Sequence, residues 1–187
     1  MISSAIESVV QELDQFLRVK FQLTESGAIL SNLTNLDGSI AAKEMNKVVV
    51  TLVNIQEDKL AHNKFNRGSK IGQSLPVYLN VQILISANFD EKLAKESLRF
   101  ISAVVAFFQS KNVFTPSNTP SLDNSIEKLV FEIVNLEFTE QSNLFSSLGA
   151  KYLPSMLYRM RMLAIEEGNM QYTAGPVRGK GVNTSQE

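Results

Sequence analysis

The sequence predicts a single domain of the α+β class, with a mostly antiparallel sheet of about four main strands and two long amphipathic helices packed on one face. Two segments show the apolar spacing of helices, and others alternate between apolar and polar residues as strands do. The expected order is helix, strand, strand, helix, strand, strand. Because neighbouring strands with direct connections usually pair, this order favours an antiparallel sheet with helical cover.

The first segment, residues 2–17, has apolar residues at steps of three and four, which is typical of an amphipathic helix. Ser4, followed by Glu7 three residues later, fits a capping box at its start. Residues 23–47 mix turn-forming residues with short apolar pieces. We therefore expect a connector there, with a short edge strand near residues 28–31.

Two strands are expected next. Residues 48–55 are β-branched and apolar at both alternating positions, which indicates a strand covered on both sides. Residues 77–86 alternate more cleanly, so one face should pack on a core while the other is largely polar. Between them, residues 57–74 are polar and contain two glycines, which predicts a long loop.

A second amphipathic helix is expected to end near residue 109. Asn88, with Glu91 three residues on, fits an N-cap, and apolar residues then recur at helical spacing. This helix is the expected cover of the apolar sheet face. A third strand is predicted near residues 128–136, and a short helix around 139–147 that stops at a glycine.

The final strand is expected over residues 154–165. Its side chains alternate between the two faces, so Arg159 and Arg161 should lie on the same face of the sheet. Beyond Glu167 the periodicity is lost. This predicts one folded domain over residues 1–167 and a flexible C-terminal tail over residues 168–187.

Composition excludes several classes of function. The 18 Lys and Arg balance 19 Asp and Glu, so no overall field attracts nucleic acid or an anionic membrane. The absence of Cys excludes disulfides and thiolate chemistry. The N-terminus is acidic rather than basic, and no apolar run approaches the roughly 18 residues of a membrane span. We expect synthesis in the cytoplasm.

The titratable residues form no catalytic motif. His62 is the only histidine, and no acidic or nucleophilic partner stands at a suitable spacing. The glycine-rich residues 175–181 lack the spacing and flanking elements of a phosphate-binding loop. Adjacent carboxylates at 57–58 and 166–167 point in different directions and do not converge on one substrate. We expect no catalysis, no cofactor and no metal site.

Two groups of cations are the candidate partner-binding residues. They are Lys59, Lys64, Arg67 and Lys70 in the long loop, and Arg159 and Arg161 in the final strand. A loop of this length is either a binding segment or disordered, and the sequence favours neither. The two arginines either pair with Glu132 on the preceding strand or are presented to a partner subunit.

Three segments together carry a family resemblance: VNIQEDK at 53–59, FFQSKNVFTP at 107–116 and LGAKYLPSMLYRMRML at 148–163. They are similar to the cap protein of extracellular contractile injection systems, of the antifeeding-prophage and Photorhabdus-virulence-cassette type. The resemblance covers most of residues 2–165. The chain departs from the family pattern at Phe145, where a Trp is more usual.

The resemblance implies a fold like that of phage tail terminators and assembly as a ring of six. Such a ring would dock on the last ring of inner tube protein and contact the terminal sheath layer, which stops tube growth and stabilises the finished tail. The residues alone leave two other hypotheses open. One is a monomeric adaptor or chaperone-like binding module, and the other is a small α+β enzyme.

Overall fold

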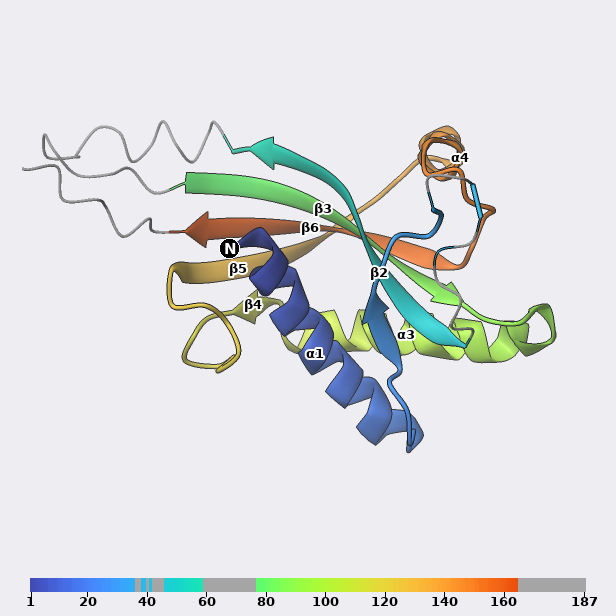
Figure 1. Ribbon diagram of the computed structural model, residues 1–187, viewed down its shortest axis with the longest axis horizontal. Helices are drawn as coiled ribbons and strands as arrows, with labels where there is room; N and C mark the ends of the chain where they lie inside the picture. Colours follow the sequence, from blue (N-terminus) through green and yellow to red (C-terminus); the bar gives the residue numbers. More distant parts are fainter. Residues whose placement is uncertain (36–37, 40, 42–45, 59–76, 165–187) are drawn as a thin grey trace, which may run out of the picture.

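The computed structural model describes residues 1–35, 38–39, 41, 46–58 and 77–164 (Figure 1). The helices in these ranges are α1 (Ile2–Phe21), α3 (Ala94–Ser110) and α4 (Phe138–Ser147), with a 3-10 turn, η1 (Glu91–Leu93), before α3. The strands are β1 (Ala28–Leu30), β2 (Lys47–Glu57), β3 (Val77–Asn88), β4 (Val113–Phe114), β5 (Ile126–Val134) and β6 (Ser155–Ala164).

These strands form one sheet in the order β1-β2-β3-β6-β5-β4. All neighbours are antiparallel except β1 and β2, which are parallel. Helices α1 and α3 lie on one face, and α4 sits apart from them near one end of the sheet (Figure 1). The predicted α+β class is confirmed. The predicted number of about four strands was too low, because β1 and β4 are very short edge strands.

Helix α1 buries the apolar face that its spacing predicted, and it continues past the predicted end to Phe21. The predicted capping box at Ser4 and Glu7 was wrong. The helix begins at Ile2, so Ser4 already lies in the first turn, where its hydroxyl donates to the carbonyl of Met1 at 2.8 Å. A residue inside the helix cannot supply the extended backbone that an N-cap requires.

A single carboxylate joins α1 to the edge strand β1. One oxygen of Asp14 accepts from the backbone N–H of Gly27 at 2.6 Å, from that of Ala28 at 3.1 Å and from the hydroxyl of Ser26 at 3.0 Å. A Cβ atom at Gly27 would lie 2.8 Å from Cδ1 of Leu23 and 3.2 Å from Cβ of Leu17, so a larger residue there would require the Leu23 side chain to move. The edge strand predicted near residues 28–31 is confirmed by β1.

The main core lies between the sheet and the two long helices. Strand β3 places Val81, Ile83 and Ile85 in this core, which confirms the apolar face predicted for residues 77–86. At its centre the ring of Tyr158 packs against that of Phe108, with the ring centroids 4.5 Å apart. Burial of apolar surface here is the main stabilising contribution to the fold.

Helix α3 begins later than the sequence predicted, and Asn88 is not its N-cap. Asn88 is the last residue of β3, opposite Lys47 in the antiparallel ladder, so its backbone belongs to the sheet. Asp90 starts the turn instead, and its carboxylate accepts from the N–H of Lys92 at 2.9 Å. An Asp and an Asn fit an N-cap equally well, and strand pairing decides between them.

A second, smaller core lies on the opposite face of the sheet, under α4. Leu84 of β3 and Leu157 of β6 are buried there with Val49, and Phe145 of α4 covers them. The prediction that this face is largely polar therefore holds only for the part of the sheet that α4 does not cover. Strand β5 also lies two residues before its predicted position, because the chain leaves the sheet after Val134 and Leu136 packs against this second core.

Candidate protein-binding surface

The part of this second face that α4 leaves open carries the predicted arginines. The backbone register places Arg161 between Asn80 of β3 and Val130 of β5, and Arg159 between Gln82 of β3 and Glu132 of β5. We call this surface the outer face. Its residues are Tyr78, Asn80 and Gln82 of β3, Lys128, Val130 and Glu132 of β5, and Arg159 and Arg161 of β6.

Glu132 forms an ion pair with Arg161, which confirms the predicted pairing with one of the two arginines. The side chains of Arg161 and Glu132 are 48% and 41% exposed, so water screens the pair and it contributes about 0–1 kcal/mol to stability. Among the described residues Arg159 makes no ion pair.

A cavity of about 270 Å³ opens at one end of the outer face. Tyr78, Lys128, Val130 and Arg161 contribute to its lining. Loss of hydration, with a smaller effect of the Glu127 carboxylate, raises the pKa of the Tyr78 phenol, so this group remains a hydrogen-bond donor at neutral pH. The cavity thus combines the cations of Lys128 and Arg161 and the carboxylate of Asp58 with apolar walls, a composition suited to a partner surface that has both charged and apolar groups.

Buried polar atoms without a partner occur on both faces of the sheet. On the outer face, the side-chain oxygen of Asn80 is buried and accepts no hydrogen bond from a described residue. In the main core the hydroxyl of Tyr158 likewise has no partner in the described part of the chain, and burial raises its pKa to about 12. A buried polar group without a partner lowers the stability of the fold by about 1–3 kcal/mol. The packing of the rest of the side chain, or a hydrogen bond made in an assembly, offsets this loss.

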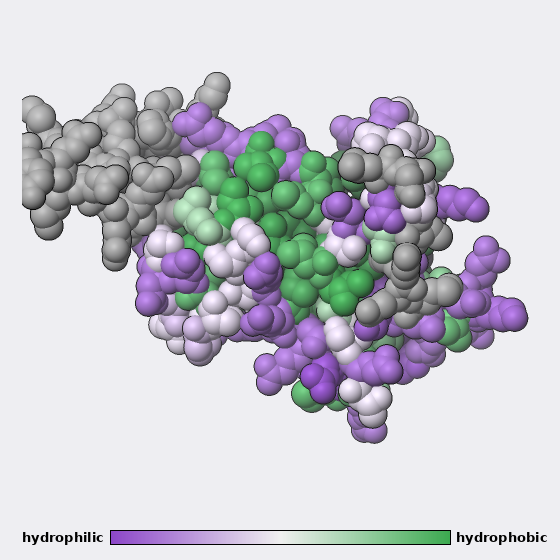
Figure 2. Space-filling view, viewed as in Figure 1, coloured by the Kyte–Doolittle hydropathy of each residue, from purple (hydrophilic) through white to green (hydrophobic). Residues whose placement is uncertain are grey.

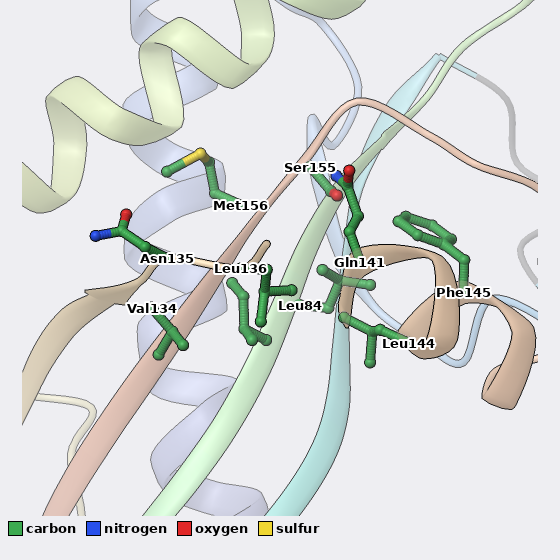
Figure 3. Close-up of a pocket in the computed structure, with 10 residues that line it drawn as sticks. Leu84, Val134, Asn135, Leu136, Gln141, Leu144, Phe145, Ser155 and Met156 are labelled. Atoms are coloured by element: carbon green, nitrogen blue, oxygen red, sulfur yellow. The ribbon is translucent and has the colours of Figure 1, made fainter. Parts of the chain in front are cut away.

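A second cavity, of about 200 Å³, lies between α4 and the sheet. Figure 3 shows Leu144 of α4 beside Leu84 of β3, with Phe145 next along the helix. Its polar lining comes from Asn135, Gln141 and Ser155, and none of its lining residues is titratable. General acid or base catalysis requires a group that exchanges protons, so this cavity has the chemistry of a packing site.

Apolar side chains also gather on the helix side of the molecule, over the sheet beside α1 (Figure 2). Leu30 of β1 is 40% exposed, and Leu52 and Ile55 of β2 are 37% and 42% exposed. Leu52 and Ile55 lie beyond the part of β2 that pairs with β1, which ends at Val50, whereas β2 continues to Glu57. This strip is a further apolar surface on the described part of the chain.

Several predicted positions lie outside the described residues. They are Lys59, Lys64, Arg67 and Lys70, together with His62 and the tail over 168–187. In the ranges that the structure covers, no group of three or more acidic or histidine side chains could hold a metal ion. No helix in those ranges is both long and apolar enough to cross a membrane.

Sequence reasoning missed three functional candidates. Lys128 and Tyr78 join Arg161 around the larger cavity, and Phe138 at the start of α4 is 84% exposed. The alternation of β5 could have placed Lys128 on the face of Glu132. The exposure of Phe138 had no such signal, because a single Phe at the start of a helix is as compatible with a buried position as with an exposed one.

Comparison with known proteins gave a family match. A family model described as the Pvc16 N-terminal domain matches residues 5–179. A search of curated proteins gave no significant match.

Two solved structures are similar in fold. One is the sheath/tube terminator of an extracellular contractile injection system, PVC, in its extended state, with a TM-score of 0.58 and 20% identity over 97% of this chain and 64% of that one. The other is the tube-terminating cap of the anti-feeding prophage, with a TM-score of 0.57 and 17% identity over 94% of this chain and 60% of that one. The chain therefore spans less than two thirds of either.

Proposed function

The chain belongs to the family of Pvc16 N-terminal domains, and from this membership we propose that it is a structural cap of a phage-tail-like contractile injection system. The resemblance carried by three segments of the sequence is confirmed by the family match and by both similar structures. In the proposed role the chain forms a ring that ends and stabilises the inner tube and contacts the terminal sheath layer.

One observation carries this proposal: 97% of the chain matches the fold of a sheath/tube terminator, and 94% matches that of a tube-terminating cap. The domain common to both is the one that this chain provides. Its outer face supports the role, because it offers cations and a cavity to a protein surface. A binding role of this kind needs no catalytic residues, and none is part of the proposal.

We propose six copies in the ring, with the inner tube protein and the sheath protein as its other partners. Contacts with these partners are assigned to Arg159 and Arg161 on the outer face and to four loop cations, Lys59, Lys64, Arg67 and Lys70. A ring subunit needs two different surfaces for its neighbours and a further one for the tube. The folded domain over residues 1–167 would provide them, and the tail over 168–187 would stay free before assembly.

Assembly in the bacterial cytoplasm, followed by incorporation into the particle, completes the proposal. The decisive experiment is electron microscopy of particles purified from cells with and without the gene, with the chain located by a fused tag. We expect density for the chain at the tube end, and tubes of irregular length when it is missing. Particles of normal length in the deletion strain, with no tag at the tube end, would favour the adaptor hypothesis.

A further inference from the structure

The N-terminal end of α4 presents an exposed aromatic ring between two carboxylates. Phe138 is the first residue of the helix and is 84% exposed. Glu137 and Glu140 form a reciprocal capping box around it, in which the N–H of Glu137 donates to the Glu140 carboxylate at 2.9 Å. The capping box fixes the backbone on both sides of the ring. We call Glu137, Phe138 and Glu140 the α4 nose.

The cavity at the end of the outer face has complementary properties, and we call it the terminal groove. It encloses about 270 Å³, and its lining includes Tyr78, Lys128, Val130 and Arg161. Lys128 is exposed and has no ion-pair partner among the described residues. Arg161 binds Glu132 but has five N–H donors, enough for a second carboxylate. Asp58 also lines the cavity and is its single acidic residue.

The nose and the groove lie at opposite ends of the sheet. Helix α4 stands near one end, whereas β3 begins and β6 ends at the other (Figure 1). A contact between the nose of one copy and the groove of another leaves one nose and one groove free. Such head-to-tail contacts add further copies until the chain of subunits closes into a ring.

We propose that the α4 nose of one copy docks into the terminal groove of the next copy. Phe138 enters the cavity, and the carboxylates of Glu137 and Glu140 face Lys128 and Arg161. The occupant is a second copy of this chain because the nose carries two carboxylates, whereas the groove has two cations, Lys128 and Arg161, against the single carboxylate of Asp58, and because one chain carries both parts. The inference rests on the proposed ring-forming function and names the neighbour contact within it.

The physical roles of the two parts differ. A large, rigid aromatic side chain buried at the centre of a contact is the usual source of most of its binding free energy. The opposite charges around it act mainly on the orientation and rate of association, and salt screens them. The ring of Phe138 should therefore control how much complex forms, and ionic strength should control how fast it forms.

Engineered disulfides test the contact directly, because the chain has no cysteine of its own. The test variant carries Thr139→Cys beside the nose and Val130→Cys in the groove, which keeps Phe138 and every charge in place. The matched control carries Thr139→Cys with Val19→Cys, since Val19 on α1 is 75% exposed and outside the proposed contact. Both variants are oxidised as purified full-length chains and within purified particles, and then separated on non-reducing gels.

We expect the test variant to give a ladder of dimers, trimers and larger products, and the control to give none beyond dimers. Adding Phe138→Ala should lower the yield of the ladder at least about tenfold. Raising the salt from about 0.1 M to about 1 M should slow crosslinking several-fold, because the Debye length falls to about 3 Å.

A yield no higher than that of the control, in both solution and particles, would overturn the inference. A ladder that does not respond to Phe138→Ala would overturn it as well, because the ring would not be the anchor. The proposed function fails separately, when the chain is missing from the tube end whether or not the ladder forms. A chain located at the tube end without a ladder keeps the cap role and rejects this neighbour contact.

Discussion

Glu132 pairs with Arg161 although the residue directly opposite it in the sheet is Arg159. The two arginines share one face of β6, so Glu132 can reach either one, and the diagonal partner is the one it binds. This choice leaves Arg159 without an ion pair among the described residues. The two arginines therefore differ in role: Arg161 has a partner within the sheet but keeps N–H donors for a second one, whereas Arg159 forms no ion pair with any described residue.

The first prediction separates these two roles. Arg159→Glu should reduce the fraction of particles that carry the chain at the tube end, because it places a negative charge where a partner carboxylate is expected. Its midpoint of urea unfolding should change little, since no ion pair in the described structure is lost. Arg161→Ala is the matched control for stability and should cost about 0–1 kcal/mol, as exposed ion pairs do. Normal capping by Arg159→Glu would remove Arg159 from the proposed interface.

The second prediction concerns the long loop. Changing Lys64, Arg67 and Lys70 together to Glu should weaken capping, measured as particle yield and tube length, if the loop contacts neighbouring subunits. The isolated chain should keep its circular dichroism spectrum and its unfolding midpoint. A variant with the same three residues changed to Gln separates loss of charge from charge reversal. Unchanged particle yield and tube length in the Glu variant would eliminate the loop from the interface.

The periodic parts of the chain were predictable from sequence because a single spacing decides them. The alternation at residues 77–86 placed Val81, Ile83 and Ile85 on the core side, and they lie there. The same rule placed Arg159 and Arg161 on one face of the last strand, and the structure agrees. Periodicity reports which side of an element is buried, and this information is local.

The errors came where tertiary contacts decide between equal local signals. Asn88 and Asp90 are both good helix caps, and the pairing of Asn88 with Lys47 makes Asp90 the start of the turn. The strand at 126–134 was predicted two residues too late because Leu136 leaves the sheet and packs against the core under α4. Leu84 lies on the predicted polar face and is buried only because α4 folds over it. None of these contacts is local in sequence.

The third prediction tests the link between α1 and β1. Asp14→Ala removes an acceptor of three hydrogen bonds, from Ser26, Gly27 and Ala28. Two of these donors are backbone N–H groups, so we expect a loss of about 1.5–3 kcal/mol in the free energy of unfolding. Asp14→Asn keeps an acceptor oxygen and should lose less than half as much. Equal losses in the two variants, measured by urea unfolding, would mean that packing rather than hydrogen bonding makes the link.

The fourth prediction uses the unsatisfied hydroxyl of Tyr158. Its folded pKa of about 12 lies above the ordinary value of 10.0, so the folded state favours the protonated phenol. The stabilisation that the protonated Tyr158 phenol gives the folded state is therefore fully present below pH 10 and is lost as the pH rises toward 12. Ionisation in the unfolded chain then costs the wild type up to roughly 3 kcal/mol, at about 1.4 kcal/mol for each unit of pKa difference.

Tyr158→Phe removes both the ionisation and the unpaired hydroxyl while keeping the ring contacts with Phe108 and Phe131. At pH 7 the variant should be as stable as the wild type or up to about 1 kcal/mol more stable, because a buried donor without a partner is no longer desolvated. Between pH 10 and pH 12 its advantage should grow. Thermal unfolding at several pH values measures both effects. A variant that is less stable than the wild type at pH 7 would mean that the hydroxyl has a partner in solution, with a bound water molecule as the first candidate.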